Sequence, residues 1–167
     1  TMTALDISSN KRIGAAGKDK LGTVLPLSRT PLQQFWCTEW SIDANDKEPL
    51  DLSGKQLLAA DAKLLASVLR SFPLDASFQT LNVLGNSFQE GAAHITAAFE
   101  ESSTLQSLCG LAPTDTAAML ADGIVKCAAD LQFVISDMRS HPALTELDLR
   151  QNAIGGKADV AEVLASF

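Results

Sequence analysis

The sequence predicts an α/β solenoid in which about seven short parallel strands form a concave sheet and helices cover the convex side. Three observations lead to this fold class. A strand pattern recurs along the chain, helical patterns lie between its copies, and a longer stretch is duplicated. The chain has 167 residues, of which 46% are hydrophobic, so it can bury a core and disorder is unfavourable.

The strand pattern occurs near the start, in the middle and near the end of the chain, each time reading apolar-x-apolar-x-x-Asn. Its two alternating apolar side chains would lie on one face of a strand. The Asn would end the strand, where its amide can satisfy backbone groups of the turn. Another apolar residue precedes each copy by three positions. The copies are residues 5–10, 81–86 and 147–152, preceded by Met2, Phe78 and Leu144.

A longer duplication contains the clearest helical pattern. Identical residues within 54–73 recur without gaps within 123–142. In the first copy, apolar residues at helical spacing predict a helix over 61–72, and in the second copy they predict one over 130–140. A proline follows each helix and stops it. The constant offset places Ala121 at a strand position where the first copy has Leu.

These patterns together predict the order of elements along the whole chain. Weaker helical patterns add to the two helices of the duplication. Strands are expected near 4–7, 33–37, 49–52, 80–83, 105–109, 118–121 and 146–149, and the weaker helices at 15–25, 91–101 and 158–167.

The strand pattern resembles the leucine-rich repeat, L-x-x-L-x-L-x-x-N-x-L. A repeat of about 28 residues with full helices resembles the ribonuclease-inhibitor-like class of these repeats. The Leu-Cys-Gly strand at 108–110, followed by a short loop, resembles repeat arrays in large proteins of algae and other protists. The resemblance covers essentially the whole chain. It implies a horseshoe segment and protein binding.

We expect residues 1–167 to form a single leucine-rich-repeat domain. Solenoids need polar caps over their terminal apolar layers. This chain starts almost at a strand and ends within an apolar helical pattern. A fragment of a longer protein or array is therefore expected.

Charge and cysteine content restrict the partner and the compartment. The net charge of −7 disfavours nucleic acid and anionic membranes, and it favours a basic protein partner. No apolar run approaches the roughly 20 residues of a membrane helix. Three cysteines without a C-x-x-C pair favour reduced thiols in an intracellular, cytoplasmic protein.

No set of residues suggests catalysis, a cofactor or a metal site. The only histidines, His94 and His141, are not near a cysteine in sequence, and metal-binding spacings are absent. The glycine-rich stretches at 14–17 and 155–157 lack phosphate-loop spacing. We therefore expect a protein that is not an enzyme and binds no cofactor.

The candidate binding residues are those that strand alternation sends to the concave face. Four are carboxylates, which are either ordinary filler of Leu-Asp-Leu strands or an acidic stripe for a basic partner. The two tryptophans, Trp36 and Trp40, lie in an irregular segment and are either core residues or exposed anchors. The strand positions are Asp6, Ser8, Asp51, Ser53, Asn82, Asp122, Asp148 and Arg150.

The sequence thus favours a non-catalytic protein–protein interaction module or scaffold subunit that binds a partner on its concave face, within a larger assembly. Two alternatives share the fold class. One is the regulatory solenoid of an enzyme system, such as a GTPase-activating protein. The other is the sensor region of an immune-type receptor.

Overall fold

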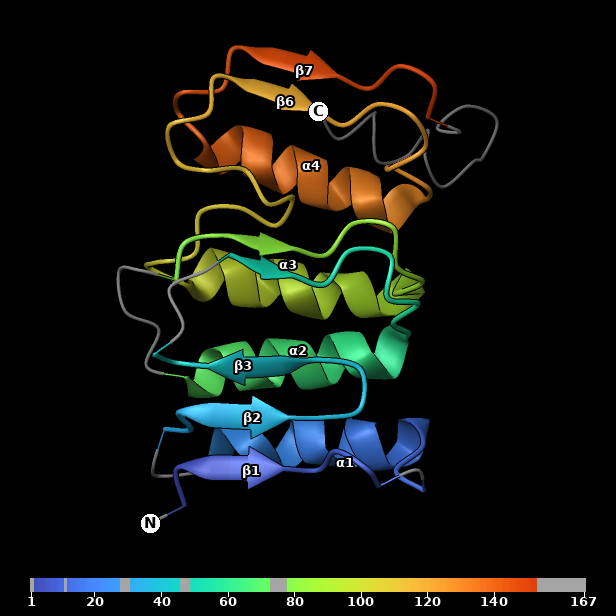
Figure 1. Ribbon diagram of the computed structural model, residues 1–167, viewed down its shortest axis with the longest axis vertical. Coiled ribbons are helices and arrows are strands. Elements are labelled where there is room, and N and C mark those ends of the chain that lie inside the picture. The colour runs from blue at the N-terminus through green and yellow to red at the C-terminus, as the bar shows by residue number, and fades with distance from the viewer. Residues whose placement is uncertain (1, 11, 28–30, 46–48, 73–77, 153–167) are drawn as a thin grey trace.

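The computed structural model describes residues 2–10, 12–27, 31–45, 49–72 and 78–152. The strands stack in one layer and the helices α1 to α4 stack behind them in chain order (Figure 1). The face of the strand layer that points away from the helices is called the open face below. This arrangement fits a leucine-rich-repeat fold.

Four α-helices and seven strands are described, with two short 3₁₀ turns. Every predicted helix within the described residues is confirmed to within about two residues, and the helix expected at 158–167 lies outside them. The elements are β1 (Ala4–Asp6), α1 (Ala15–Val24), η1 (Leu25–Leu27), β2 (Gln34–Trp36), β3 (Ser41–Asp43), β4 (Leu50–Asp51), α2 (Ala59–Ser71), β5 (Leu81–Asn82), η2 (Gln89–Gly91), α3 (Ala92–Glu101), β6 (Ala117–Met119), α4 (Ala128–Ser140) and β7 (Glu146–Asp148).

The prediction of one seven-stranded parallel sheet is wrong. The strands form three sheets, with orders β1-β2-β3, β4-β5 and β6-β7, so the segments around Leu5, Leu81 and Leu147 lie in separate sheets. The pairs β1-β2, β4-β5 and β6-β7 are parallel as expected, but β2-β3 is antiparallel. The strand β3 was not predicted.

The first break in the sheet arises because β3 folds back on β2 and takes the edge that would face β4. The second break lies after the segment 105–109, which bonds to β5 only through isolated bridges. The backbone NH groups of Leu108 and Cys109 donate to the carboxylate of Asp137 on α4, at 2.7 and 3.0 Å. A side chain on the helix layer therefore uses donors that could otherwise pair with β6.

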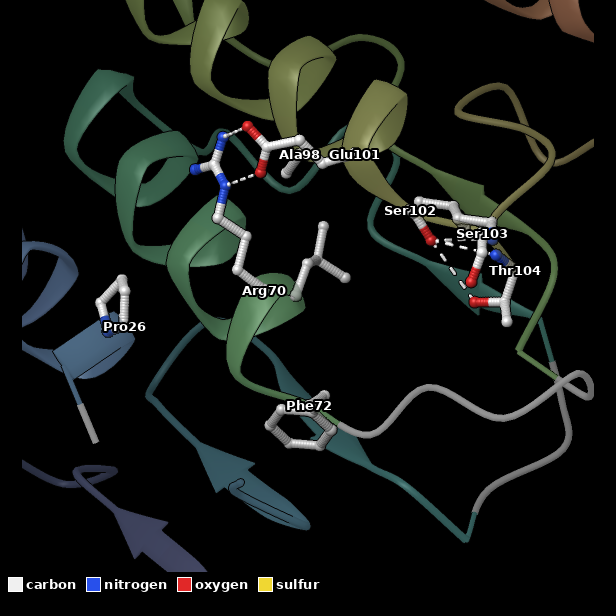
Figure 2. Close-up of a pocket in the computed structure, with 10 residues that line it drawn as sticks. Pro26, Arg70, Phe72, Ala98, Glu101, Ser102, Ser103 and Thr104 are labelled. Carbon is white, nitrogen blue, oxygen red and sulfur yellow. Dashed lines mark hydrogen bonds and ion pairs between the residues drawn. The ribbon is translucent and has the colours of Figure 1, made fainter. Parts of the chain in front are cut away.

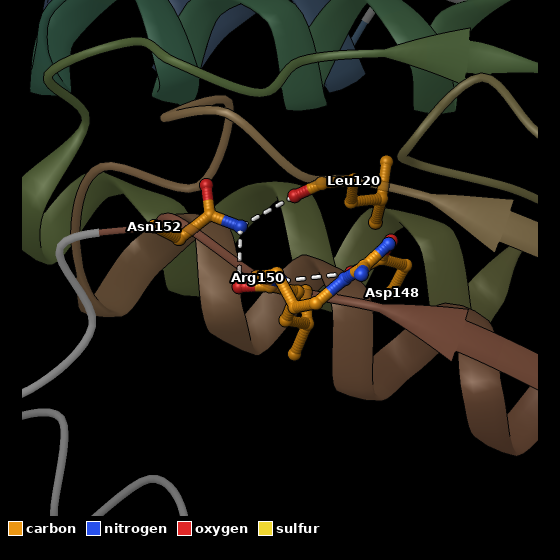
Figure 3. Close-up of polar contacts among 5 residues, drawn as sticks. Leu120, Asp148, Arg150 and Asn152 are labelled. Carbon is orange, nitrogen blue, oxygen red and sulfur yellow. Dashed lines mark hydrogen bonds and ion pairs between the residues drawn. The ribbon is translucent and has the colours of Figure 1, made fainter.

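The repeated asparagines satisfy backbone groups of their turns, as predicted, and two of the three also link successive turns. The buried Asn86 accepts the NH of Leu57 at 3.0 Å, and it donates to the carbonyls of Leu52 and Val83 at 2.8 and 2.9 Å. Asn152 repeats this arrangement with Val125, Leu120 and Leu149, and Figure 3 shows its bond to the carbonyl of Leu120. Each of these two asparagines therefore links its own turn to the preceding strand unit.

The helices pack closely behind the strands, around one continuous apolar core. Gly91 marks a close approach of two helical segments, because a Cβ built there would lie 2.7 Å from the Cα of Ala59. Phe88 and Phe133 pack edge to face in the core, with ring centroids 6.1 Å apart. This packing fixes the strand layer whose open face carries the candidate residues.

Candidate protein-binding surface

Four polar side chains occupy equivalent places where strands end on the open face. Asp6, Asp51, Asn82 and Asp148 each accept the backbone NH of the residue two positions on, at 2.8, 2.9, 3.2 and 2.9 Å. Such bonds stabilise the turn after the strand. Asp6 and Asp51 are exposed, so their carboxylates can also meet a partner.

Ser8 and Ser53 follow these carboxylates and donate the backbone NH groups just described. Both serines are half-buried. Hydrogen bonds from the Ser8 hydroxyl and backbone NH lower the pKa of Asp6, so this exposed side chain is ionised at neutral pH. The serines thus support the display of charge, and less of their own surface is open to a partner.

Trp36 lies between the acidic positions on the open face. It is half-buried, and its register partner on β1 is Asp6. On the other side, Asp43 of β3 accepts the NH of Asn45 at 2.9 Å and the side-chain amide of Gln34 at 2.7 Å, and these bonds lower the pKa of Asp43. The first sheet therefore combines an indole with two ionised carboxylates.

Trp40 is in the core, which corrects its inclusion among the binding residues. It is 4% exposed, and its ring centroid lies 5.0 Å from that of Phe35. The β2-β3 hairpin brings it there, with the Trp40 carbonyl accepting the NH of Cys37 at 2.9 Å. Of the two tryptophans, Trp36 alone has surface available for a partner.

Asp122 does not occupy a strand position, which corrects a second prediction. Ala118 and Leu120 of the β6 region are buried, so Met119 points outward and is 64% exposed. Asp122 follows the strand with a φ of 62°. Asn86 and Asn152 accept the NH groups of Leu57 and Val125, so these two residues are equivalent, at an offset of 68 (125 minus 57). The helices α2 and α4 begin at an offset of 69 (128 minus 59). The loop between strand and helix therefore holds one more residue in the second copy than in the first.

That extra residue explains why the constant offset failed in the strand. Strand side chains alternate between faces, so a shift by one residue exchanges the inner and outer sets. The structural equivalent of Asp51 is therefore Met119, which pairs in register with Asp148. The acidic row is interrupted by an apolar side chain at β6.

At the end of the row, Arg150 neutralises Asp148. A nitrogen of the Arg150 guanidinium lies 2.6 Å from Asp148 Oδ2, in a pairing that Figure 3 shows. In this pair the Arg150 side chain is 82% exposed, whereas the Asp148 side chain is 13% exposed. The Arg150 side chain, with its backbone NH, lowers the pKa of Asp148 to about 2. The charge of Asp148 is thus neutralised, whereas Asp122 and Glu146 are further exposed carboxylates at this end of the strand layer.

A hollow of about 380 Å³ lies beside this ion pair. It contains two exposed apolar side chains, Met119 and Ile124, of which Ile124 is 41% exposed. The sequence did not indicate it, because the offset placed Met119 inward. The residues around it are Met119, Ala121, Asp122, Ile124, Asp148, Arg150 and Gln151.

A larger hollow of about 440 Å³ lies away from the open face, at the C-terminal ends of α2 and α3 (Figure 2). Its wall holds Arg70 and Glu101, joined by two hydrogen bonds of 2.6 and 3.2 Å. Arg70 and Glu101 therefore already have each other as charged hydrogen-bond partners. Its size alone gives no reason to prefer it to the open face as a binding site.

The remaining polar groups have structural roles. Asp130 and Asp137 are buried and accept backbone NH groups. The cysteines are free thiols, and burial raises the pKa of the Cys37 thiol to about 11. In the described ranges, no group of three or more His, Cys, Asp and Glu side chains could hold a metal ion. No helix among the described residues is long and apolar enough to cross a membrane.

Comparison with known proteins supports the repeat assignment. Residues 1–22 and 140–158 match a family described as Leucine Rich repeat. The two matches contain the first and the last copies of the strand pattern and support a leucine-rich-repeat protein. Such domains generally mediate protein–protein interaction and are typically non-catalytic. No curated protein matches the chain.

Proposed function

We propose that this chain is a non-catalytic interaction module that binds a basic protein through its open face, which corresponds to the concave side of a leucine-rich-repeat solenoid. The observation that carries the proposal is the repeated display of exposed carboxylates, Asp6 and Asp51, at equivalent strand ends. Trp36 lies between them and offers an aromatic surface.

The charges support a basic partner for a physical reason. Among the described residues, the ion pairs of Lys18, Lys63, Arg70 and Arg150 do not involve Asp6 or Asp51, whereas Asp148 is neutralised by Arg150. Carboxylates arranged in this way raise the local negative potential and speed the encounter with a basic surface. The net charge of −7 acts in the same direction.

Two finer assignments belong to the same proposal. Full α-helices behind the strands support the ribonuclease-inhibitor-like class, and a scaffold role in a larger assembly is part of the same proposal. Three free thiols, two of them buried, support an intracellular, cytoplasmic location, where thiols stay reduced. The resemblance to algal and protist arrays suggests a eukaryotic source.

The test removes charge without removing the turn hydrogen bonds. Asn82 shows that an amide accepts the same backbone NH as the aspartates do. The double variant Asp6→Asn, Asp51→Asn should therefore fold normally, but should associate with the partner about 3- to 10-fold more slowly at low salt. A partner would be found by affinity capture and identified by mass spectrometry, and association rates would then be measured with the purified partner.

The matched control is Glu90→Gln, Glu100→Gln, which removes the same charge from exposed positions on the helix layer. It should leave association with the partner nearly unchanged. The proposal also requires weaker binding as salt rises. Association that is indifferent to salt, or equally slowed by both double variants, would contradict it.

A further inference from the structure

The open face presents an exposed apolar side chain at the position where a carboxylate would continue the acidic row. Met119 is 64% exposed and stands at the structural equivalent of Asp51. Its counterpart Asp51 is polar and exposed, whereas the inward neighbours of the two residues, Leu52 and Leu120, are buried and apolar. Met119 is thus an outward-pointing apolar side chain of the strand layer.

Met119 does not stand alone on this part of the surface. Ile124, which is 41% exposed, lines the same hollow of about 380 Å³. The salt-bridged Asp148 and Arg150 and the exposed carboxylate of Asp122 belong to the polar rim. Apolar floor and polar rim together resemble the anatomy of a protein-binding patch.

We infer that this hollow takes a large apolar side chain, such as leucine, from the same basic partner, an inference that rests on the proposed function. Charge complementarity selects the occupant. The exposed carboxylates Asp6 and Asp51 in the row and Asp122 at the hollow favour a partner segment with lysine or arginine, whereas Asp148 is already neutralised by Arg150. A flexible thioether adapts to apolar side chains of several shapes.

The topology sets the spacing within the partner segment. Asp51 on β4 and Met119 on β6 are separated by β5 and the segment 105–109, which makes three steps, and the last step crosses the break before β6, so it is at least as long as a hydrogen-bonded step. At about 4.8 Å a step the separation is roughly 14 Å or more, and an extended peptide advances about 3.3 Å per residue. The apolar residue should therefore stand about four to six residues from the nearest basic residue.

The test uses synthetic peptides as probes. Each is a 12-residue Gly/Ser peptide with two adjacent lysines, and a series places a single leucine at successive distances from them. The protein carries ¹³C-methyl methionine, which reports Met2, Met119 and Met138 separately. A leucine at the predicted distance should shift the Met119 methyl resonance and tighten binding about tenfold over the lysine-only peptide.

Variants then assign the effect. Met119→Ala should remove the gain from leucine and leave the affinity for the lysine-only peptide unchanged. Met119→Asp should also remove the gain, and should tighten the lysine-only peptide by extending the acidic row. Val24→Ala, which trims an exposed apolar residue at the end of α1, should change neither affinity.

The outcomes separate this inference from the proposed function. If lysine binding depends on salt and on Asp6 and Asp51 but leucine adds nothing at any spacing, the apolar site is wrong and the proposed function stands. A leucine effect that survives Met119→Ala, or that shifts only Met2 or Met138, also overturns the site. If no peptide binds and the Asp6, Asp51 double variant has no effect on the partner, both fail.

Discussion

At the scale of single residues, the same side chain ends a strand and displays a charge. Asp6 and Asp51 each accept a backbone NH with one oxygen and remain exposed. Their pattern was readable in the sequence, because the Leu-Asp-Leu alternation fixes which side chains point outward. The same side chains also stabilise the turn after the strand, and substitution by asparagine removes the charge while keeping the turn hydrogen bond.

The repeated asparagine gives the first stability prediction. Asn86→Ala would leave the NH of Leu57 and the carbonyls of Leu52 and Val83 without partners in a buried turn. We expect a loss of about 2–4 kcal/mol in the free energy of unfolding, measured in urea. Asn10→Ala is the control, because Asn10 is exposed and bonds only within its own turn, so it should cost less than about 1 kcal/mol.

Asp137 gives a pH prediction. Burial raises the pKa of this carboxyl group. The hydrogen bonds from Ser107, Leu108 and Cys109 lower it, but by less than burial raises it. Between 3.8 and the native pKa, the unfolded chain has released the proton while the native chain still holds it. The contribution of Asp137 to stability is therefore present below pH 3.8 and falls as the pH rises through the native pKa.

Carboxyl ¹³C NMR would measure this titration. The midpoint for Asp137 should lie above 3.8, whereas that for Asp148, held by Arg150, should lie near 2. A midpoint for Asp137 below 3.8 would show that its hydrogen bonds outweigh its burial.

At the scale of elements, the helices followed from the sequence and the strand pairing did not. Apolar spacing determined α2 and α4 to within two residues, because helical contacts are local. The hairpin β2-β3 has no repeat counterpart in the sequence, and the break after 105–109 depends on Asp137 in a distant helix. Pairing of this kind is decided by contacts between remote segments, which a repeat pattern does not reveal.

The register of β6 shows the same limit. The identities over 123–142 gave a constant offset, which was extended from the helix back into the strand. The offset is wrong in the strand, because one additional loop residue changes which side chains face outward. Asp122 was therefore predicted on the open face in place of Met119. The signal available in the sequence was Ala121, a small residue at a position where a strand leucine was expected.

The close packing of α2 against the start of α3 gives a prediction at this scale. Gly91 has an ordinary φ of −67°, so Gly91→Ala would be penalised by contact and not by backbone conformation. We expect it to destabilise the protein by about 1–3 kcal/mol in urea unfolding. Gly14→Ala, where nothing lies within 4 Å of the new Cβ, should be close to neutral.

At the scale of the whole molecule, three short sheets stand in place of one continuous sheet, yet the strand layer still presents a shared open face (Figure 1). Its N-terminal part displays Asp6, Trp36 and Asp51, and its C-terminal part displays Met119 and the Asp148–Arg150 pair. Of the predicted acidic stripe, Asp6, Asp51 and Asp148 lie where strands end on this face, whereas Asp122 follows its strand. That the stripe binds a partner stays a prediction, and we propose that Asp6 and Asp51 carry its charge.

Carboxyl footprinting tests the central claim most directly. Exposed carboxylates would be labelled with a carbodiimide and an amine, with and without the partner, and the modified sites read by mass spectrometry. The account predicts that the partner protects Asp6 and Asp51 on the open face, while Glu90 and Glu100 on the helix layer remain labelled. Protection of Glu90 and Glu100 with continued labelling of Asp6 and Asp51 would contradict it.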